Sequence, residues 1–91
     1  MNNLLPIFMK LEGVPCLVVG GGKIALKKIH QLIHSKAMVT VVSPEISESI
    51  HSLPVTAVNR CYQPGDLNGV RLVIAATDKS KVNRQVYLDT Q

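Results

Sequence analysis

The residues whose types and spacing could do chemistry lie in one short segment, Gly20-Gly21-Gly22-Lys23-Ile24-Ala25. This segment fits the pattern G-x-G-x-x-G/A. In that pattern the first glycine allows a tight turn, the second lets the backbone approach a pyrophosphate, and the small last residue lets a helix lie close to a sheet. Exposed amides at the start of the helix would stabilise the negative charge of the phosphates. The segment therefore predicts a dinucleotide site, and a tight strand–helix turn without a ligand is the alternative.

The elements on either side give this pattern its meaning. Cys16 to Val19 is a continuous apolar run, which is typical of a strand buried on both faces. From Lys23 to about Ser35 the apolar residues recur at helical spacing, with lysines and histidines mostly on the other side. A second strand is predicted at Val39 to Val42. Together these segments form the strand–helix–strand unit of about 30 residues that the pattern requires.

The rest of the chain continues the alternation. Leu4 to Met9 is predicted to be an extended apolar lead-in, and Glu45 to Leu53 a short helix with Ser43 as its cap and Pro44 as its first residue. Further strands are predicted at Val55–Tyr62 and Leu72–Ala76, a turn at Gln63–Gly69, and a helix from Lys81 to Tyr87. This order predicts an α/β fold in one domain over residues 1–91, a Rossmann-like parallel sheet in three layers.

The end of the second predicted strand bears on the choice of cofactor. A carboxylate there would hydrogen-bond the ribose of NAD, whereas a basic residue would hold the 2′-phosphate of NADP. Ser43-Pro44-Glu45 lies about 20 residues past the fingerprint, and no Arg or Lys follows until Arg60, so NAD is favoured. An equally good interpretation makes Glu45 a first-turn acid stabilised by the helix dipole, with Ser43 serving only as a cap.

Thr77 and Asp78 lie at the carboxyl end of a predicted core strand. Open α/β sheets bind their ligands at this edge, which makes both residues candidates for cofactor contacts. Alternatively, Asp78 caps the helix that follows. The residues alone leave both interpretations open.

Composition and spacing disfavour several other classes of function. The net charge is +4, but the basic residues are scattered, and two Tyr, one Phe and no Trp give too few rings to stack on nucleic-acid bases. His30 and His34 are one helical turn apart but have no third ligand, so we expect no metal site. We expect Cys16 to be a reduced, buried thiol. No signal sequence or membrane span is recognisable, so we expect a cytoplasmic protein without membrane contact.

Four motifs in order resemble the N-terminal NAD-binding domain of the precorrin-2 dehydrogenase (siroheme synthase) family. They are Leu5-Pro6-Ile7-Phe8, Cys16-Leu17-Val18-Val19-Gly20-Gly21-Gly22, Val39-Thr40-Val41-Val42-Ser43-Pro44, and Ala75-Ala76-Thr77-Asp78 with Val82-Asn83. The resemblance implies NAD-dependent oxidation of precorrin-2 to sirohydrochlorin in siroheme biosynthesis. It also implies a homodimer, and many members insert ferrous iron. By resemblance, Gly20 to Ala25 would hold the pyrophosphate, Ser43, Pro44 and Glu45 the adenosine ribose, and Thr77 and Asp78 would lie beside the cofactor.

Two departures from the family qualify this expectation. Members have a further strand after the last helix, with an aspartate implicated in catalysis, whereas this sequence stops at Gln91. We therefore expect a sheet truncated after about four strands and assign no catalytic residue. The second departure is Lys36, where relatives commonly have a glycine, so we expect a less regular end to the first helix.

The sequence thus predicts the NAD-binding part of a precorrin-2 dehydrogenase and leaves open whether this chain is itself an enzyme. One alternative is a regulatory module that senses NAD and catalyses nothing. Another is a structural or interaction domain whose glycine turn binds no ligand.

Overall fold

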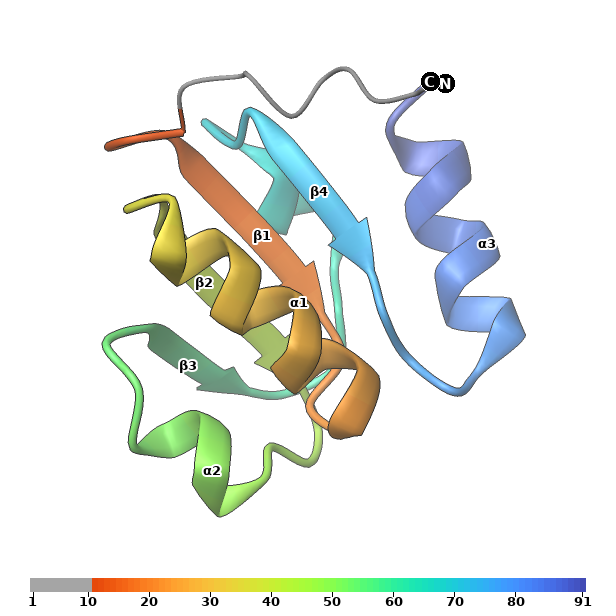
Figure 1. Cartoon of the computed structure of the whole chain (residues 1–91). Coiled ribbons are helices and arrows are strands. Elements are labelled where there is room, and N and C mark those ends of the chain that lie inside the picture. Colours follow the sequence, from red (N-terminus) through yellow and green to blue (C-terminus); the bar gives the residue numbers. More distant parts are fainter. Residues whose placement is uncertain (1–10) are drawn as a thin grey trace, which may run out of the picture.

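The computed structural model describes residues 11–91, so the predicted lead-in at Leu4–Met9 and the motif at Leu5–Phe8 lie outside the described residues. The elements in chain order are β1 (Pro15–Val19), α1 (Lys23–His34), β2 (Met38–Ser43), α2 (Glu48–His51), β3 (Thr56–Asn59), the 3-10 helix η2 (Pro64–Leu67), β4 (Leu72–Ala75) and α3 (Ser80–Asp89). The four strands form a parallel sheet in the order β3-β2-β1-β4, as Figure 1 shows. The predicted α/β, Rossmann-like parallel sheet is confirmed.

The strand order reverses at β1. The chain first builds outward from β1 to β2 and β3, and then returns to place β4 on the other side of β1. Val19 at the end of β1 lies opposite Val42 of β2 and Ala75 of β4, so the carboxyl ends of three strands meet at one edge. Such a reversal opens a crevice outside the carboxyl ends of the strands, because the connections on its two sides leave in different directions.

Side chains of β1 alternate between two apolar cores, one on each face of the sheet. On one face Cys16 and Val18 pack with Ala25 and Ile29 of α1 and with Ile50 of α2. The opposite core is made by Leu17, Val19, Val42 and Val86, and it is completed by partly buried residues of α3 and of the η2 region. Helices therefore cover both faces of the sheet, and the predicted three layers are present (Figure 1).

Two strands differ from the sequence prediction, β3 in its length and β4 in its burial. β3 stops at Asn59 instead of Tyr62, and β4 is only partly buried, with Ala75 exposed, although Leu72–Ala76 reads as a strand buried on both faces. β4 lies at an edge of the described sheet, which explains its exposure. An apolar run reports the composition of a strand and not its position in the sheet.

The predicted helix over Glu45–Leu53, with Ser43 as its cap, was wrong in its start. The helix, α2, begins at Glu48 and has Ser47 at its N-cap position. Ser43 is the last residue of β2 and pairs with Asn59 of β3. Pairing with β3 holds Ser43 in extended backbone, so it cannot start the helix.

The first helix ends in a regular motif, contrary to the expectation raised by Lys36. The amide of Lys36 donates to the carbonyl of Ile33 at 2.8 Å, and the amide of Ala37 donates to Leu32 at 3.1 Å. These are the two hydrogen bonds of a Schellman motif, which places its C′ residue in the left-handed region. Lys36 occupies that position with a φ of +63°, so the motif forms at the cost of a strained lysine.

Candidate cofactor site

A cleft of about 970 Å³ lies at the carboxyl edge of the sheet, where the strand order reverses. The glycine turn after β1, the loop after β2, the segment after β3 and the loop after β4 line its walls. Ten of the eleven predicted site residues line this cleft: Gly20, Gly21, Gly22, Lys23, Ile24, Ser43, Pro44, Glu45, Thr77 and Asp78. Ala25 does not, because it is fully buried in the core between α1 and the sheet.

The three glycines of the turn have different surroundings. Gly20 has a φ of +137°, and a Cβ added there would lie 2.5 Å from the carbonyl oxygen of Ala76. A Cβ on Gly21 would overlap the backbone carbonyl of Glu45, whereas a Cβ on Gly22 would meet no atom within 4 Å. Close contacts with the flanking loops therefore require the first two glycines. The third turns its open side away from protein atoms.

The start of α1 suits an anionic group. Gly22 is the N-cap of the helix, and no side chain within residues 11–91 accepts a hydrogen bond from the amides of its first turn. That turn carries no acidic residue and begins with Lys23. Free amides, the positive end of the helix dipole and a lysine all favour negative charge at this position. The open space at Gly22 leaves room for it, so the residues present fit a pyrophosphate.

The loop after β2 forms the wall beside Gly21. The amide of Ser47 donates to the carbonyl of Gly21 at 3.0 Å, which joins this loop to the glycine turn. Glu45 is exposed and lines the cleft. The interpretation of Glu45 as a first-turn acid of a helix was wrong, because α2 begins three residues later and its first-turn acid is Glu48.

The loop after β4 forms the wall beside Gly20. The interpretation of Asp78 as a helix cap was also wrong, because α3 has Lys79 at its N-cap position and the side chain of Asp78 makes no capping bond. Instead, the hydroxyl of Thr77 accepts a hydrogen bond from the amide of Lys79 at 3.0 Å. Asp78 is exposed and lines the cleft.

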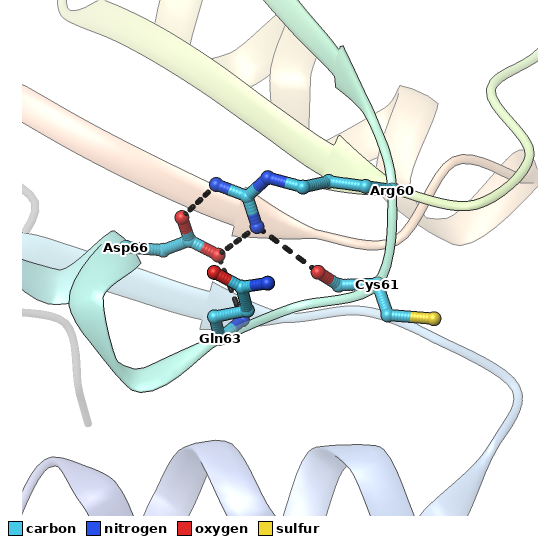
Figure 2. A network of polar contacts seen from close by, with 4 residues as sticks. All are labelled: Arg60, Cys61, Gln63 and Asp66. Atoms are coloured by element: carbon cyan, nitrogen blue, oxygen red, sulfur yellow. Dashed lines mark hydrogen bonds and ion pairs between the residues drawn. The ribbon is translucent and has the colours of Figure 1, made fainter.

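Cys61 and Tyr62 line the cleft and were missed by sequence reasoning. A bidentate ion pair holds this segment, since the guanidinium of Arg60 donates to both carboxylate oxygens of Asp66, at 3.0 and 2.5 Å. Arg60 also donates to the carbonyl of Cys61 at 3.0 Å, and the amide of Gln63 donates to Asp66 at 2.8 Å. Figure 2 shows the guanidinium between Asp66 and the Cys61 carbonyl, with the sulfur of Cys61 pointing away. The turn-rich stretch after Tyr62 was the only signal that the chain folds back here.

The pKa values of Asp66 and Tyr62 are shifted in this segment. The hydrogen bonds from Arg60 hold the pKa of Asp66 below its ordinary value, against the opposing effect of burial. Burial raises the pKa of Tyr62 to about 12, and its hydrogen bond to Asp89 adds to the shift. That bond, 2.9 Å from the hydroxyl to a carboxylate oxygen, joins the segment after β3 to the end of α3.

Within the described part of the chain, no group of three or more His, Cys, Asp and Glu side chains could hold a metal ion. In residues 11–91, moreover, no helix is long and apolar enough to cross a membrane.

Comparison with known proteins places this cleft in context. The family model described as "Putative NAD(P)-binding" matches residues 7–91. The siroheme synthase of Methylobacillus flagellatus is 47% identical over 91 residues, which cover 96% of this chain and 20% of the relative. The siroheme synthase of Pseudomonas putida strain W619 is 46% identical over 93 residues, which cover 98% of this chain and 20% of the relative.

A solved structure, "SirC, precorrin-2 dehydrogenase", superposes with a TM-score of 0.85 at 30% sequence identity, covering 92% of this chain and 44% of that one. The chain thus spans about a fifth of the length of these siroheme synthases and less than half of the solved dehydrogenase.

Proposed function

This chain belongs to the NAD(P)-binding family found in siroheme synthases and precorrin-2 dehydrogenases, and on that premise we propose that it is the NAD-binding part of a precorrin-2 dehydrogenase. The complete protein would oxidise precorrin-2 to sirohydrochlorin. The observation that carries the proposal is the cleft where the strand order reverses, with an open glycine and uncapped helix amides at its base. The relatives reported above are named as enzymes, which lends no support to a purely regulatory module.

Each wall of the cleft would bind a different part of the cofactor. The amides of Gly22, Lys23 and Ile24 would hold the pyrophosphate, and the charge of Lys23 would add to their field. Ser43, Pro44 and Glu45 would hold the adenosine ribose, and Thr77 and Asp78 would lie farther along the cofactor. Gly20, Gly21 and Ala25 would shape the turn by packing. When bound, NAD supplies the hydride acceptor for the oxidation.

The exposed carboxylate of Glu45 supports NAD over NADP. A carboxylate can accept hydrogen bonds from ribose hydroxyls, but it repels a 2′-phosphate. The basic residues that line the cleft are Lys23 and Lys79, at the glycine turn and the β4 side, and none comes from the loop after β2. At the loop after β2, a 2′-phosphate would therefore meet the carboxylate of Glu45 and no basic side chain.

Calorimetric titration with NAD and with NADP tests this proposal. We expect saturable binding of NAD, about tenfold tighter than NADP, and a smaller preference in the Glu45→Gln variant. Equal or tighter binding of NADP would contradict the NAD assignment. If a folded sample bound neither nucleotide, the proposed function itself would fail.

We further propose that residues 1–91 fold as one domain, that the protein acts in the cytoplasm and that it works as a homodimer. Sedimentation equilibrium of the purified protein tests the dimer. A monomer at all concentrations would contradict it.

A further inference from the structure

One side chain of α3 holds the loop after β4 by three hydrogen bonds. The Oδ1 of Asn83 accepts from the amide of Thr77 at 3.3 Å and from its hydroxyl at 3.0 Å. The Nδ2 of Asn83 donates to the carbonyl of Thr77 at 3.0 Å. Both backbone polar groups of Thr77 are therefore satisfied by a single amide. We refer to these contacts as the Thr77–Asn83 network.

The hydroxyl of Thr77 is engaged within the same loop. It accepts from the amide of Lys79 and also lies 2.9 Å from the carbonyl of Lys79. A hydroxyl has one hydrogen to donate, and here two acceptors of the protein compete for it. Thr77 therefore has no free hydroxyl hydrogen for a ligand, and its side chain shapes the loop.

This loop bears directly on the glycine turn. The amide of Ala76 donates to the carbonyl of Val19 at 2.8 Å. One residue farther on, a Cβ added to Gly20 would clash with the backbone of Ala76 and would lie 3.1 Å from the amide nitrogen of Thr77. Displacement of Thr77 would therefore move atoms against Gly20, since backbone groups in van der Waals contact cannot shift independently.

Asn83 itself is held in place by the packing of α3. Val86, one turn farther along the helix, is 2% exposed and packs in the core beneath the sheet, where Val82 joins it. Asn83 does not line the cleft. Its side chain connects a helix fixed by the core to the wall of the cleft.

From this chain of contacts we infer that Asn83 is a positioning residue for the phosphate-binding turn, acting through Thr77 and Gly20. The inference rests on the proposed function, because it assigns Asn83 a part in binding the pyrophosphate of NAD. A dinucleotide site needs backbone amides held in advance at the phosphate position, since any disorder there must be removed on binding. Asn83 supplies that order without lining the cleft.

The test is a set of titrations of the full chain with NAD, ADP and adenosine. We expect Asn83→Ala to bind NAD and ADP about tenfold more weakly and adenosine equally well, because adenosine lacks the pyrophosphate. Thr77→Val, which loses the hydroxyl, should also bind ADP more weakly, and the conservative Thr77→Ser should restore most of the affinity. This pair provides a second test if Asn83→Ala does not fold.

Two further variants serve as matched controls. Gln85→Ala removes another amide side chain of α3, which bonds to Asp89 within residues 11–91. Leu32→Ala lowers stability by removing a buried side chain of α1 from the core on the opposite face of the sheet. Both should bind ADP like the unaltered chain in the folded fraction.

The inference fails if Asn83→Ala binds ADP normally, if Leu32→Ala weakens ADP binding equally, or if adenosine binding falls in parallel. Failure of the unaltered chain to bind NAD would instead overturn the proposed function, and the inference with it.

Discussion

Two walls of the same cleft are held by different kinds of interaction. Uncharged groups hold the wall after β4, where the amide of Asn83 satisfies the backbone and hydroxyl of Thr77. An ion pair between Arg60 and Asp66 holds the wall after β3. Neutral hydrogen bonds are insensitive to pH over a wide range, whereas an ion pair weakens with salt and with protonation of its acid. Acid and salt should therefore loosen the wall after β3 and leave the wall after β4 in place.

The largest effect is expected at the glycine turn, which lies against the loops after β2 and β4. In Gly21→Ala the new Cβ would overlap the backbone of Glu45, so the loop after β2 must move away from the turn. Overpacking of this kind costs about 3 kcal/mol. Denaturant unfolding should show this loss of stability, and NAD titration should show no binding.

The matched control is Gly22→Ala, one residue farther on. Its Cβ meets no protein atom, so we expect nearly unchanged stability and weakened NAD binding. If Gly21→Ala were as stable as the unaltered chain, the close contact with the loop after β2 would be disproved.

The next largest effect concerns the wall after β3, which we call the ionic wall because the Arg60–Asp66 ion pair holds it. Asp66→Asn removes the charge that Arg60 binds, and we expect the melting temperature to fall by roughly 5 °C. Because the folded pKa of Asp66 is lowered, its stabilising effect is present above the unfolded pKa of about 4 and is lost as pH falls through the folded pKa. Thermal unfolding at a series of acidic pH values should therefore show a weaker pH dependence in Asp66→Asn.

Asn83→Ala sharpens the contrast between the walls. It should keep the same acid dependence as the unaltered chain, because it removes no titrating group. A flattened acid profile in Asn83→Ala would contradict the distinction between an ionic and a neutral wall.

A smaller effect is expected for the bond that joins the two walls. Tyr62 belongs to the ionic wall, and its hydroxyl donates to Asp89 of α3, the helix that carries Asn83. The folded pKa of about 12 exceeds the ordinary value of about 10, so this stabilisation is complete below pH 10 and is lost as pH rises through 12. Tyr62→Phe should cost about 1 kcal/mol at neutral pH and reduce the loss of stability between pH 10 and 12.

Denaturant unfolding at neutral and alkaline pH measures both parts of this prediction. An alkaline profile identical to that of the unaltered chain would show that Tyr62 does not titrate with the fold.

The smallest effect is expected at the far end of α1, away from both walls. Lys36 adopts a φ of +63°, which glycine accepts without strain. Lys36→Gly should raise stability by about 0.5 kcal/mol, because the gain in the folded state is partly offset by the greater freedom of glycine in the unfolded chain. NAD affinity should not change, because Lys36 does not line the cleft. A loss of stability in chemical denaturation would contradict the strain at Lys36.

Local pattern determined much of the fold. The apolar runs at Cys16–Val19 and Val39–Val42 and the helical periodicity after Lys23 predicted β1, β2 and α1 to within a residue at each end. The glycine pattern between them predicted the turn and the edge of the sheet that carries the cleft. These features depend on neighbours in the sequence, because strand alternation, helical spacing and glycine conformation are local properties.

Tertiary structure decided the rest. Pairing with β3 kept Ser43 in the sheet and delayed α2, which exposed Glu45 to the cleft. Gly21, an unspecified position in the pattern, became the most crowded glycine because a loop some 25 residues farther along the chain packs against it. Cys61 lines the cleft in a segment that follows the early end of β3 and that Arg60 ties to Asp66. Each outcome depends on contacts between distant segments, and the spacing of residues along a chain does not reveal which distant segments will meet.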